Sequence, residues 1–275
     1  MATPTNQDKG NEKLWHQIFA LGHPDLLSFQ RLHSWLPSPP RCKMCLAPFR
    51  GVGGVYMRFR GKGPANRNPN YCSACDKFIR AYPGSAEVEL TMIIADLTDS
   101  KKLASQMTDS EWRDVLNSFY GPAVNALIET DGFFVKFVGD EVDGVYPPGF
   151  SGKDHARKAI QAAEQMLRME IPPAPNGSPV RVKVAVHTGV FCIGTVGWKD
   201  PQTGVESGPQ DVQAMGDNVH ITQLLSKAAR PGEALITEAA YVAAGGHIPN
   251  LESRQIMVEG RREPITVRVM RAASS

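Results

Sequence analysis

The chain has 275 residues, of which 42% are hydrophobic and 21% charged, a composition typical of a globular protein with room for one large domain and one small one. A formal net charge of +2 identifies no partner, and no apolar stretch approaches the roughly 20 residues that cross a bilayer, so we expect no membrane contact. The first residues lack a charged-then-apolar signal peptide, which makes a cytoplasmic protein the expectation.

Residues 1–40 are predicted to form a helical segment and a linker. Apolar residues recur at helical spacing from Glu12 to Leu36, with a break at Gly22-His23-Pro24, so we expect two short amphipathic helices. A stiff linker follows at Pro37–Pro40. The apolar stripe of the helices can either pack on the core of the same chain or mediate dimerisation.

Residues 41–84 carry two CxxC pairs, Cys42 with Cys45 and Cys72 with Cys75. Four thiolates at this spacing suit a tetrahedral zinc ion in a zinc-ribbon-like module. They also suit an iron–sulfur cluster, which we favour less. A reducing compartment argues against structural disulfides. The module is either a stapled adaptor or a redox or metal input to the rest of the chain.

The same module is strongly basic. Nine Lys and Arg residues lie between Arg41 and Arg80, against the single acid Asp76. The basic loop Arg58–Lys62 could contact nucleic acid or an acidic partner. Because Phe59 is the only aromatic residue in that loop, a nucleic-acid partner is the less favoured alternative.

Residues 85–275 alternate between strand and helix patterns. The order is strand, helix, strand, strand, helix, strand, which predicts a ferredoxin-like α+β domain with a βαββαβ core and helices on one face of the sheet. A capping box at Thr108–Glu111 opens one helix, and Gly139-Asp140 joins two strands in a tight hairpin. A second hairpin is expected to turn at Thr188-Gly189. A helix is expected from Gly216 to Ala229.

Six short motifs occur in this segment, each at an element boundary. They are Ala95–Thr98, Lys136–Glu141, Val186–Gly189, Gly194–Gly197, Met215–Val219 and Ala228–Glu233. In this order, from about Glu87 to Ala244, they resemble the class III nucleotidyl cyclase catalytic domain of adenylate and guanylate cyclases. The resemblance implies a nucleoside triphosphate substrate and a site completed by a second chain, in a homodimer or in a heterodimer with a competent cyclase.

The resemblance implies that Asp96 and Asp140 hold two magnesium or manganese ions. Each aspartate follows an apolar strand, and Mg²⁺ prefers carboxylates together with phosphate oxygens and water. The alternative is that both are ordinary turn and cap residues. The turn Leu97, Thr98, Asp99 precedes a helix, so its backbone amides could receive the phosphates.

The resemblance also assigns positions for the base and for the transition state. Lys136 matches the lysine that reads the base, and the second base-reading position falls on Gln213. The asparagine that orients the ribose falls on His220, and the arginine that stabilises phosphate charge falls on Leu224. His220 and Lys227 are candidates to supply the missing charge. We expect His187 to be structural, and Glu141 and Asp143 to lie on a solvated face.

Three functions follow as hypotheses. The first is an enzyme that converts ATP or GTP to a 3′,5′-cyclic nucleotide and pyrophosphate, weakened because losing a phosphate-directed arginine costs about 10³–10⁵ in rate. The second is a catalytically degenerate homologue that binds nucleotide or metal and acts as a regulatory or heterodimerising module. The third is a nucleic-acid-contacting zinc-ribbon protein.

Overall fold

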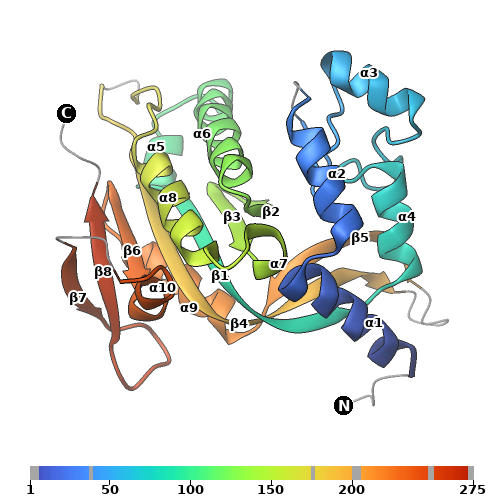
Figure 1. Ribbon diagram of the computed structural model, residues 1–275. Helices are drawn as coiled ribbons and strands as arrows, with labels where there is room; N and C mark the ends of the chain where they lie inside the picture. Colours follow the sequence, from blue (N-terminus) through green and yellow to red (C-terminus); the bar gives the residue numbers. More distant parts are fainter. Residues whose placement is uncertain (1–5, 37–39, 175–176, 200–205, 247–250, 272–275) are drawn as a thin grey trace. The chain divides into compact units, whose positions relative to one another are not determined.

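The computed structural model describes residues 6–36, 40–174, 177–199, 206–246 and 251–271. The chain divides into two compact units (Figure 1). Unit 1 comprises Met1–Val88 and Cys192–Ala214, and unit 2 comprises Glu89–Phe191 and Met215–Ser275. Over the described ranges, no helix combines the length and the apolar character that a bilayer crossing requires.

Unit 1 opens with α1 (Asn6–His16), a π-helical turn (Gln17–Leu21) and α2 (Pro24–Ser34). The predicted break is confirmed, because Gly22 takes a φ of 86° that lets the chain turn before Pro24. Trp15 and Phe19 are fully buried with stacked rings, and Trp15 Nε1 donates to the carbonyl of Tyr82 at 2.9 Å. Part of the apolar stripe therefore packs on the core of its own chain.

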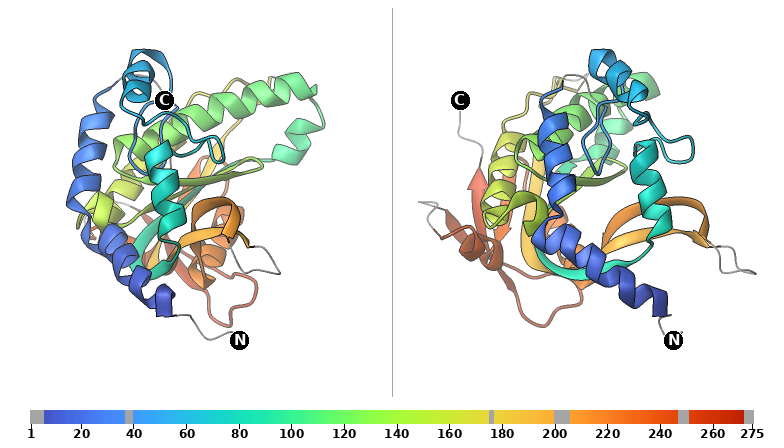
Figure 2. Two further views of the ribbon diagram at one scale, coloured as in Figure 1. Left: turned by 90° about the vertical axis from the view of Figure 1, so that its right-hand side faces the viewer. Right: turned by 45° about the vertical axis from the view of Figure 1, so that its right-hand side comes forward.

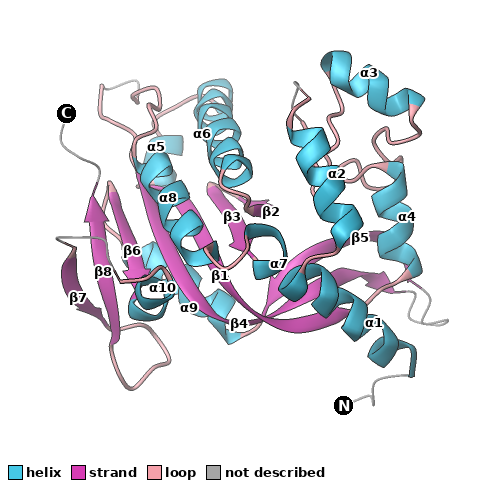
Figure 3. Ribbon diagram, in the orientation of Figure 1, coloured by secondary structure: helices cyan, strands magenta, loops and turns pink. Residues whose placement is uncertain are grey.

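The remainder of unit 1 holds the cysteines. Figure 3 shows the two further helices of this unit, α3 (Gly51–Phe59) and α4 (Ser73–Ala81). Helix α3 begins after the first CxxC pair, whereas α4 begins directly after Cys72 and contains Cys75. Isolated β-bridges join Arg41 to Pro48 and Pro64 to Cys72. Strand β5 (Glu206–Met215) pairs with β4 (Val182–Lys199), and the C-terminal part of β4 belongs to this unit.

The sheet of unit 2 confirms the α+β prediction. Its strands follow the order β2-β3-β1-β4-β6-β8-β7. The βαββαβ core is β1 (Ser85–Leu97), α6 (Asp109–Glu129), β2 (Phe133–Val138), β3 (Glu141–Tyr146), α8 (His155–Leu167) and β4. The remaining elements are α5 (Ser100–Ala104), α7 (Pro148–Ser151), α9 (Asp217–Ala228), β6 (Glu233–Thr237), α10 (Glu238–Ala243), β7 (Glu252–Ile256) and β8 (Ile265–Arg271).

Helices cover both faces of this sheet, so the expectation of helices on one face was wrong. Helices α6 and α8 lie side by side on one face (Figures 1 and 2) and pack against Val184 and Val186 of β4. Helix α9 buries Ile221 and Leu225 against Ala185, which points the other way. The reason is the two-residue alternation of a strand, which gives β4 an apolar side chain on each face.

The second predicted hairpin was also wrong, because β4 runs straight through Thr188-Gly189. Thr188 is buried, and its hydroxyl lies 2.7 Å from the Thr91 hydroxyl of β1. A Cβ on Gly189 would lie 2.8 Å from the side-chain amide of Asn218. Gly189 therefore permits a close approach of α9 to the strand and forms no turn.

Two local predictions are confirmed. Gly139 has a φ of 61° and connects β2 to β3, with Val138 paired to Glu141 across the turn. The Thr108 hydroxyl accepts from the Glu111 amide at 3.3 Å, and Glu111 accepts from the Thr108 amide at 2.8 Å. These features depend on neighbouring residues only, so the sequence specifies them directly.

Candidate catalytic and metal-binding sites

Asp96 and Asp140 lie together at one edge of the unit 2 sheet. Asp96, the penultimate residue of β1, lies directly opposite Glu141 of β3, and Asp140 immediately precedes Glu141 in the hairpin turn. Asp140 is near enough to affect the titration of Asp96. Burial, and then the neighbouring Asp140, raise the pKa of Asp96 to about 7, although Lys183 opposes this shift. Two crowded carboxylates of this kind are a donor set that suits a hard divalent cation.

Lys183, which sequence reasoning missed, contacts this pair. Its Nζ lies 2.9 Å from Asp96 Oδ2, and both side chains are largely buried. The lysine interrupts an apolar run of β4, and that interruption was the available sequence signal. Lys183 partly neutralises Asp96, so a cation arriving at the aspartates must compete with an ammonium group already in place.

Lys136 has a partner that the sequence did not predict. On β2 it lies opposite Asp143 of β3, with its Nζ 4.0 Å from Asp143 Oδ2. Asp143 is fully buried, which contradicts the expectation of a solvated face. Neither of its carboxylate oxygens has a hydrogen-bond partner among the residues described. Burial raises the pKa of Asp143 to about 6, against the opposing effect of Lys136.

The turn Leu97, Thr98, Asp99 retains only part of its predicted donor capacity. The amide of Thr98 donates to the Arg181 carbonyl at 2.9 Å, and the amide of Leu97 faces the Asp140 carbonyl at 3.4 Å. Asp99 takes a left-handed φ of 54° before α5. Thr98 and Asp99 line a cavity of about 280 Å³ together with the cations Lys102 and Arg181.

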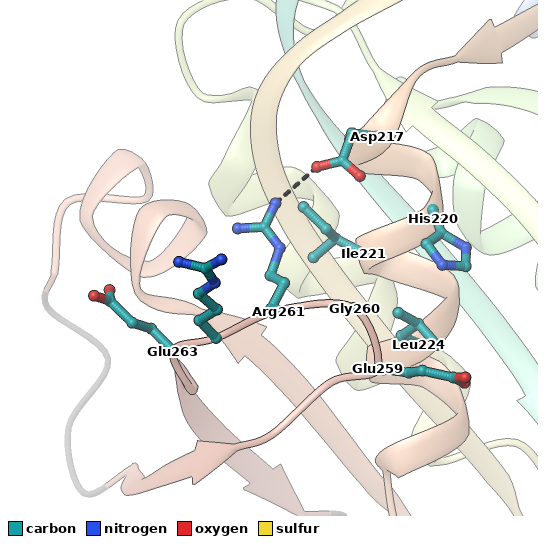
Figure 4. Close-up of a pocket in the computed structure, with 9 residues that line it drawn as sticks. Asp217, His220, Ile221, Leu224, Glu259, Gly260, Arg261 and Glu263 are labelled. Carbon is teal, nitrogen blue, oxygen red and sulfur yellow. Dashed lines mark hydrogen bonds and ion pairs between the residues drawn. The ribbon is translucent and has the colours of Figure 1, made fainter.

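His220 and Leu224 line a pocket of about 480 Å³ (Figure 4). The loop between β7 and β8 forms its other wall and contributes Arg261 and Arg262. Arg261 forms an ion pair with Asp217 at 2.7 Å, at the first turn of α9. Three acidic residues also line the pocket: Asp217, Glu259 and Glu263.

Lys227 and Gln213 lie elsewhere. Lys227 is exposed near the end of α9 and does not line the His220 pocket; its charge acts on Glu141, lowering the pKa of a carboxyl that burial raises. Gln213 lies on β5 in unit 1, where its Nε2 donates to Asp211 Oδ2 at 3.0 Å. Sequence reasoning gave Asp211 no role.

The four cysteines of unit 1 converge. The Sγ atoms of Cys42, Cys45, Cys72 and Cys75 all lie within 4.8 Å of one another, and the first three residues are buried. The Cys45 and Cys72 sulfurs are 3.7 Å apart, and the Cys72 amide donates to Cys42 Sγ at 3.2 Å. No disulfide links them. Buried His33 supports the first pair, with Nδ1 2.7 Å from the Cys45 carbonyl.

His187 is structural, as predicted. Its Nδ1 lies 3.1 Å from the Thr237 hydroxyl, and its Nε2 lies 3.0 Å from Asn218 Oδ1. Burial lowers the pKa of His187. With both ring nitrogens engaged, this histidine ties β4 to α9 and has no nitrogen left for chemistry.

Fold and site together define a class of protein. Residues 85–271 match the family described as the adenylate and guanylate cyclase catalytic domain. Because this match covers more than half of the chain, the chain belongs to the class III nucleotidyl cyclase family.

Two curated relatives illustrate the match. The terminal-differentiation-specific adenylate cyclase of Dictyostelium discoideum is 25% identical over 186 residues, which are 65% of this chain and 8% of that protein. The receptor-type guanylate cyclase gcy-23 of Caenorhabditis elegans is 24% identical over 179 residues, 62% of this chain and 16% of that protein. The chain therefore spans only a small part of the length of these relatives.

Solved structures share the fold. The guanylyl cyclase Cya2 superposes with a TM-score of 0.59 at 18% identity, covering 69% of this chain and 94% of that one. The adenylyl cyclase CyaB of P. aeruginosa gives 0.57 at 21% identity, covering 69% and 97%. At identities this low, the superpositions support the shared fold only. The substrate has to be inferred from the site residues of this chain.

Proposed function

We propose that this chain is a nucleotidyl cyclase that converts ATP or GTP to a 3′,5′-cyclic nucleotide and pyrophosphate. The observation that carries the proposal is the convergence of Asp96 and Asp140 at adjoining strand ends of a cyclase fold. The raised pKa of Asp96 supports it, because two carboxylates that repel each other in a buried place gain most from a bound cation.

Asp96 and Asp140 would hold two magnesium or manganese ions. When bound, such ions activate the ribose 3′-hydroxyl and neutralise the leaving pyrophosphate. Lys136 would donate to the purine edge, and Asp143 directly behind it holds the ammonium on the β2–β3 ribbon. Gln213 would supply the second contact to the base, since an amide both donates and accepts.

Arg261 and Arg262 would replace the charge lost at Leu224. Both line the same pocket as Leu224 and His220. Arg261 is already paired with Asp217 there, and Glu259 and Glu263 share the pocket, so Arg262 is the better candidate of the two. Arg262 has no ion-pair partner within the described chain and is free to meet a phosphate. Phosphates bind well to guanidinium groups because two parallel N–H bonds can form.

A turnover assay tests the cyclase. Purified protein is incubated with manganese and each triphosphate, and cyclic product is measured. We expect product from the wild type, a loss of at least about 10³ in Asp96→Ala, and no change in Asp154→Ala, an exposed carboxylate at the start of α8. Absence of product with every triphosphate contradicts the proposal.

The second candidate is a degenerate homologue that binds nucleotide without turnover. The Lys183–Asp96 ion pair and the exposed His220 at the asparagine position favour it. Calorimetry with a non-hydrolysable triphosphate separates the two. Binding without product supports the regulatory or heterodimerising role, and product that appears only after mixing with a competent cyclase identifies the heterodimer.

For the cysteines we propose a single zinc ion. Four thiolates that share one metal at Zn–S ≈ 2.3 Å lie about 3.8 Å apart. The 3.7 Å Cys45–Cys72 separation and the 4.8 Å limit fit that geometry. Thiolates of a multi-iron cluster bind different irons and so lie farther apart. Free thiols as ligands also fit a reducing, cytoplasmic setting.

Elemental analysis with an absorbance spectrum tests the zinc site. We expect one zinc per chain and no visible absorbance, with zinc lost in Cys72→Ser and retained in Cys192→Ser. Iron with acid-labile sulfide, and a brown colour, would identify a cluster instead.

A further inference from the structure

Buried polar side chains next to the two CxxC pairs form hydrogen bonds and an ion pair with strand β5. Lys43 lies between Cys42 and Cys45, and its side chain is 4% exposed. Its Nζ is 2.7 and 2.9 Å from the two carboxylate oxygens of Asp211. Tyr71, which directly precedes Cys72 and is fully buried, donates a hydrogen bond from its hydroxyl group to the same carboxylate.

Further contacts fix the backbone of β5 around Asp211. The Val212 amide lies 3.1 Å from the Tyr71 hydroxyl and 2.9 Å from Asp211 Oδ1. Buried Asn68 donates from Nδ2 to the Gln210 carbonyl at 2.8 Å. Each of these module residues lies within four positions of a cysteine, so the geometry of the metal site sets where β5 can lie.

Asp211 in turn determines the orientation of Gln213. The two side chains share a face of β5 because they are two residues apart. A carboxylate only accepts hydrogen bonds, so the Gln213 amide must turn its NH₂ group toward Asp211, at 3.0 Å. The carbonyl oxygen of Gln213 is thereby left as the acceptor for another group, such as an amino or ring N–H donor of a base.

We propose that the metal-loaded four-cysteine module controls base recognition, by holding Asp211 through Lys43 and Tyr71 so that Asp211 fixes the amide of Gln213. This inference rests on the proposed function only for the role of Gln213. Asp211 is a positioning residue. Metal loading becomes an input to the cyclase domain, because binding energy at such a site is folding energy for the residues around it.

Hydrogen–deuterium exchange tests the link without any nucleotide. In metal-loaded full-length Lys43→Met, we expect amides of residues 210–215 to exchange about tenfold faster while one metal per chain is retained. Lys62→Met is the matched control, since Lys62 belongs to the same module but lies over the Phe29 ring at 3.6 Å. Unchanged exchange in Lys43→Met overturns the proposal.

Nucleotide binding tests the recognition step. In Asp211→Asn, whichever preference the wild type shows between non-hydrolysable ATP and GTP analogues should weaken about tenfold, the cost of one fixed hydrogen bond. If Asp211→Asn weakens the binding of both analogues equally, Asp211 has a purely structural role and the proposal is overturned. If the wild type binds neither nucleotide, the proposed function fails and base recognition fails with it, while the exchange experiment still decides the link from module to strand.

Discussion

At the scale of single residues, the buried carboxylates Asp96 and Asp143 have the clearest pKa shifts of the candidate site. Asp96 has a lysine within 2.9 Å and a second carboxylate beside it, so its raised pKa marks a place for added positive charge. Among the residues that the structure describes, Lys136 at 4.0 Å is the one cation paired with Asp143, and the effect of burial on the Asp143 pKa exceeds that of the lysine. Burying an ionised carboxylate without hydrogen bonds costs free energy, so we expect ionised Asp143 to lower the free energy of unfolding while it attracts Lys136.

This cost predicts a pH-dependent stability. The folded chain keeps the Asp143 proton up to about pH 6, whereas an unfolded aspartate releases it near pH 4. The free energy of unfolding therefore falls as pH rises between these values and stays lowered above them. Asp143→Asn should gain on the order of 2–3 kcal/mol at pH 7.5, and the gain should vanish toward pH 4.

Urea unfolding of the two proteins across this pH range measures the difference. Asp114→Asn, at an exposed residue paired with Arg113, is the matched control for an Asp-to-Asn substitution and should leave the free energy of unfolding at pH 7.5 nearly unchanged. A gain of equal size at every pH would indicate better packing of the amide and would contradict the titration argument.

At the scale of elements, β4 positions residues in both units. Near its C-terminal end it approaches the start of β1, where the Thr195 amide donates to the Gly84 carbonyl at 2.9 Å. A Cβ on Gly194 would lie 2.3 Å from the Gly84 carbonyl oxygen and 2.4 Å from Ser85 Cα. These are backbone atoms, which cannot turn aside, so glycine is required by space at this position.

Gly194→Ala should therefore lower the free energy of unfolding by about 3 kcal/mol. Gly121→Ala is the matched control, because Gly121 lies inside α6 and a Cβ there would meet no atom within 4 Å apart from its chain neighbours and the backbone of its own helix. That substitution should raise stability by roughly 1 kcal/mol, the difference in helix propensity. Denaturant titration measures both, and a neutral Gly194→Ala would contradict the close approach.

At the scale of the whole molecule, the family resemblance implies active sites shared by two chains. Asp96 and Asp140 would come from one chain, and His220 with the Arg261–Arg262 loop from its partner. A symmetric dimer of this kind has two equivalent sites. In such an arrangement the metal residues and the replacement cations would not need to meet within one chain.

Mixing two inactive variants tests that arrangement. Asp96→Ala removes the metal half of a site, and Arg261→Ala with Arg262→Ala removes the cationic half. If the sites are shared within a homodimer, mixed dimers contain one intact site, and statistical mixing should restore about a quarter of the wild-type activity. If each chain carries a complete site, the mixture stays as inactive as its components.

Much of the fold, and about half of the residues of the candidate site, could be proposed from the sequence. The motifs from Ala95 to Glu233 gave the βαββαβ core, because alternation, capping and turn residues act over a few positions. Local patterns misled at Thr188-Gly189, where the glycine was interpreted as a turn. The structure requires a glycine there because Asn218, from a helix distant in the sequence, leaves no space for a Cβ. The prediction of a solvated Asp143 was also wrong, because the alternation of polar and apolar residues along a strand does not show which face of a two-stranded ribbon the rest of the chain covers.

The sequence by itself determined the cyclase fold, the two aspartates and the four cysteines. Only the tertiary structure decided which charged side chains pair with one another: Lys183 with Asp96, Arg261 with Asp217, and Lys43 with Asp211. The last two pairs are separated by 44 and 168 positions along the chain. Periodicity and capping act over single turns of helix or strand, whereas ion pairs at this separation depend on how the whole chain folds back on itself.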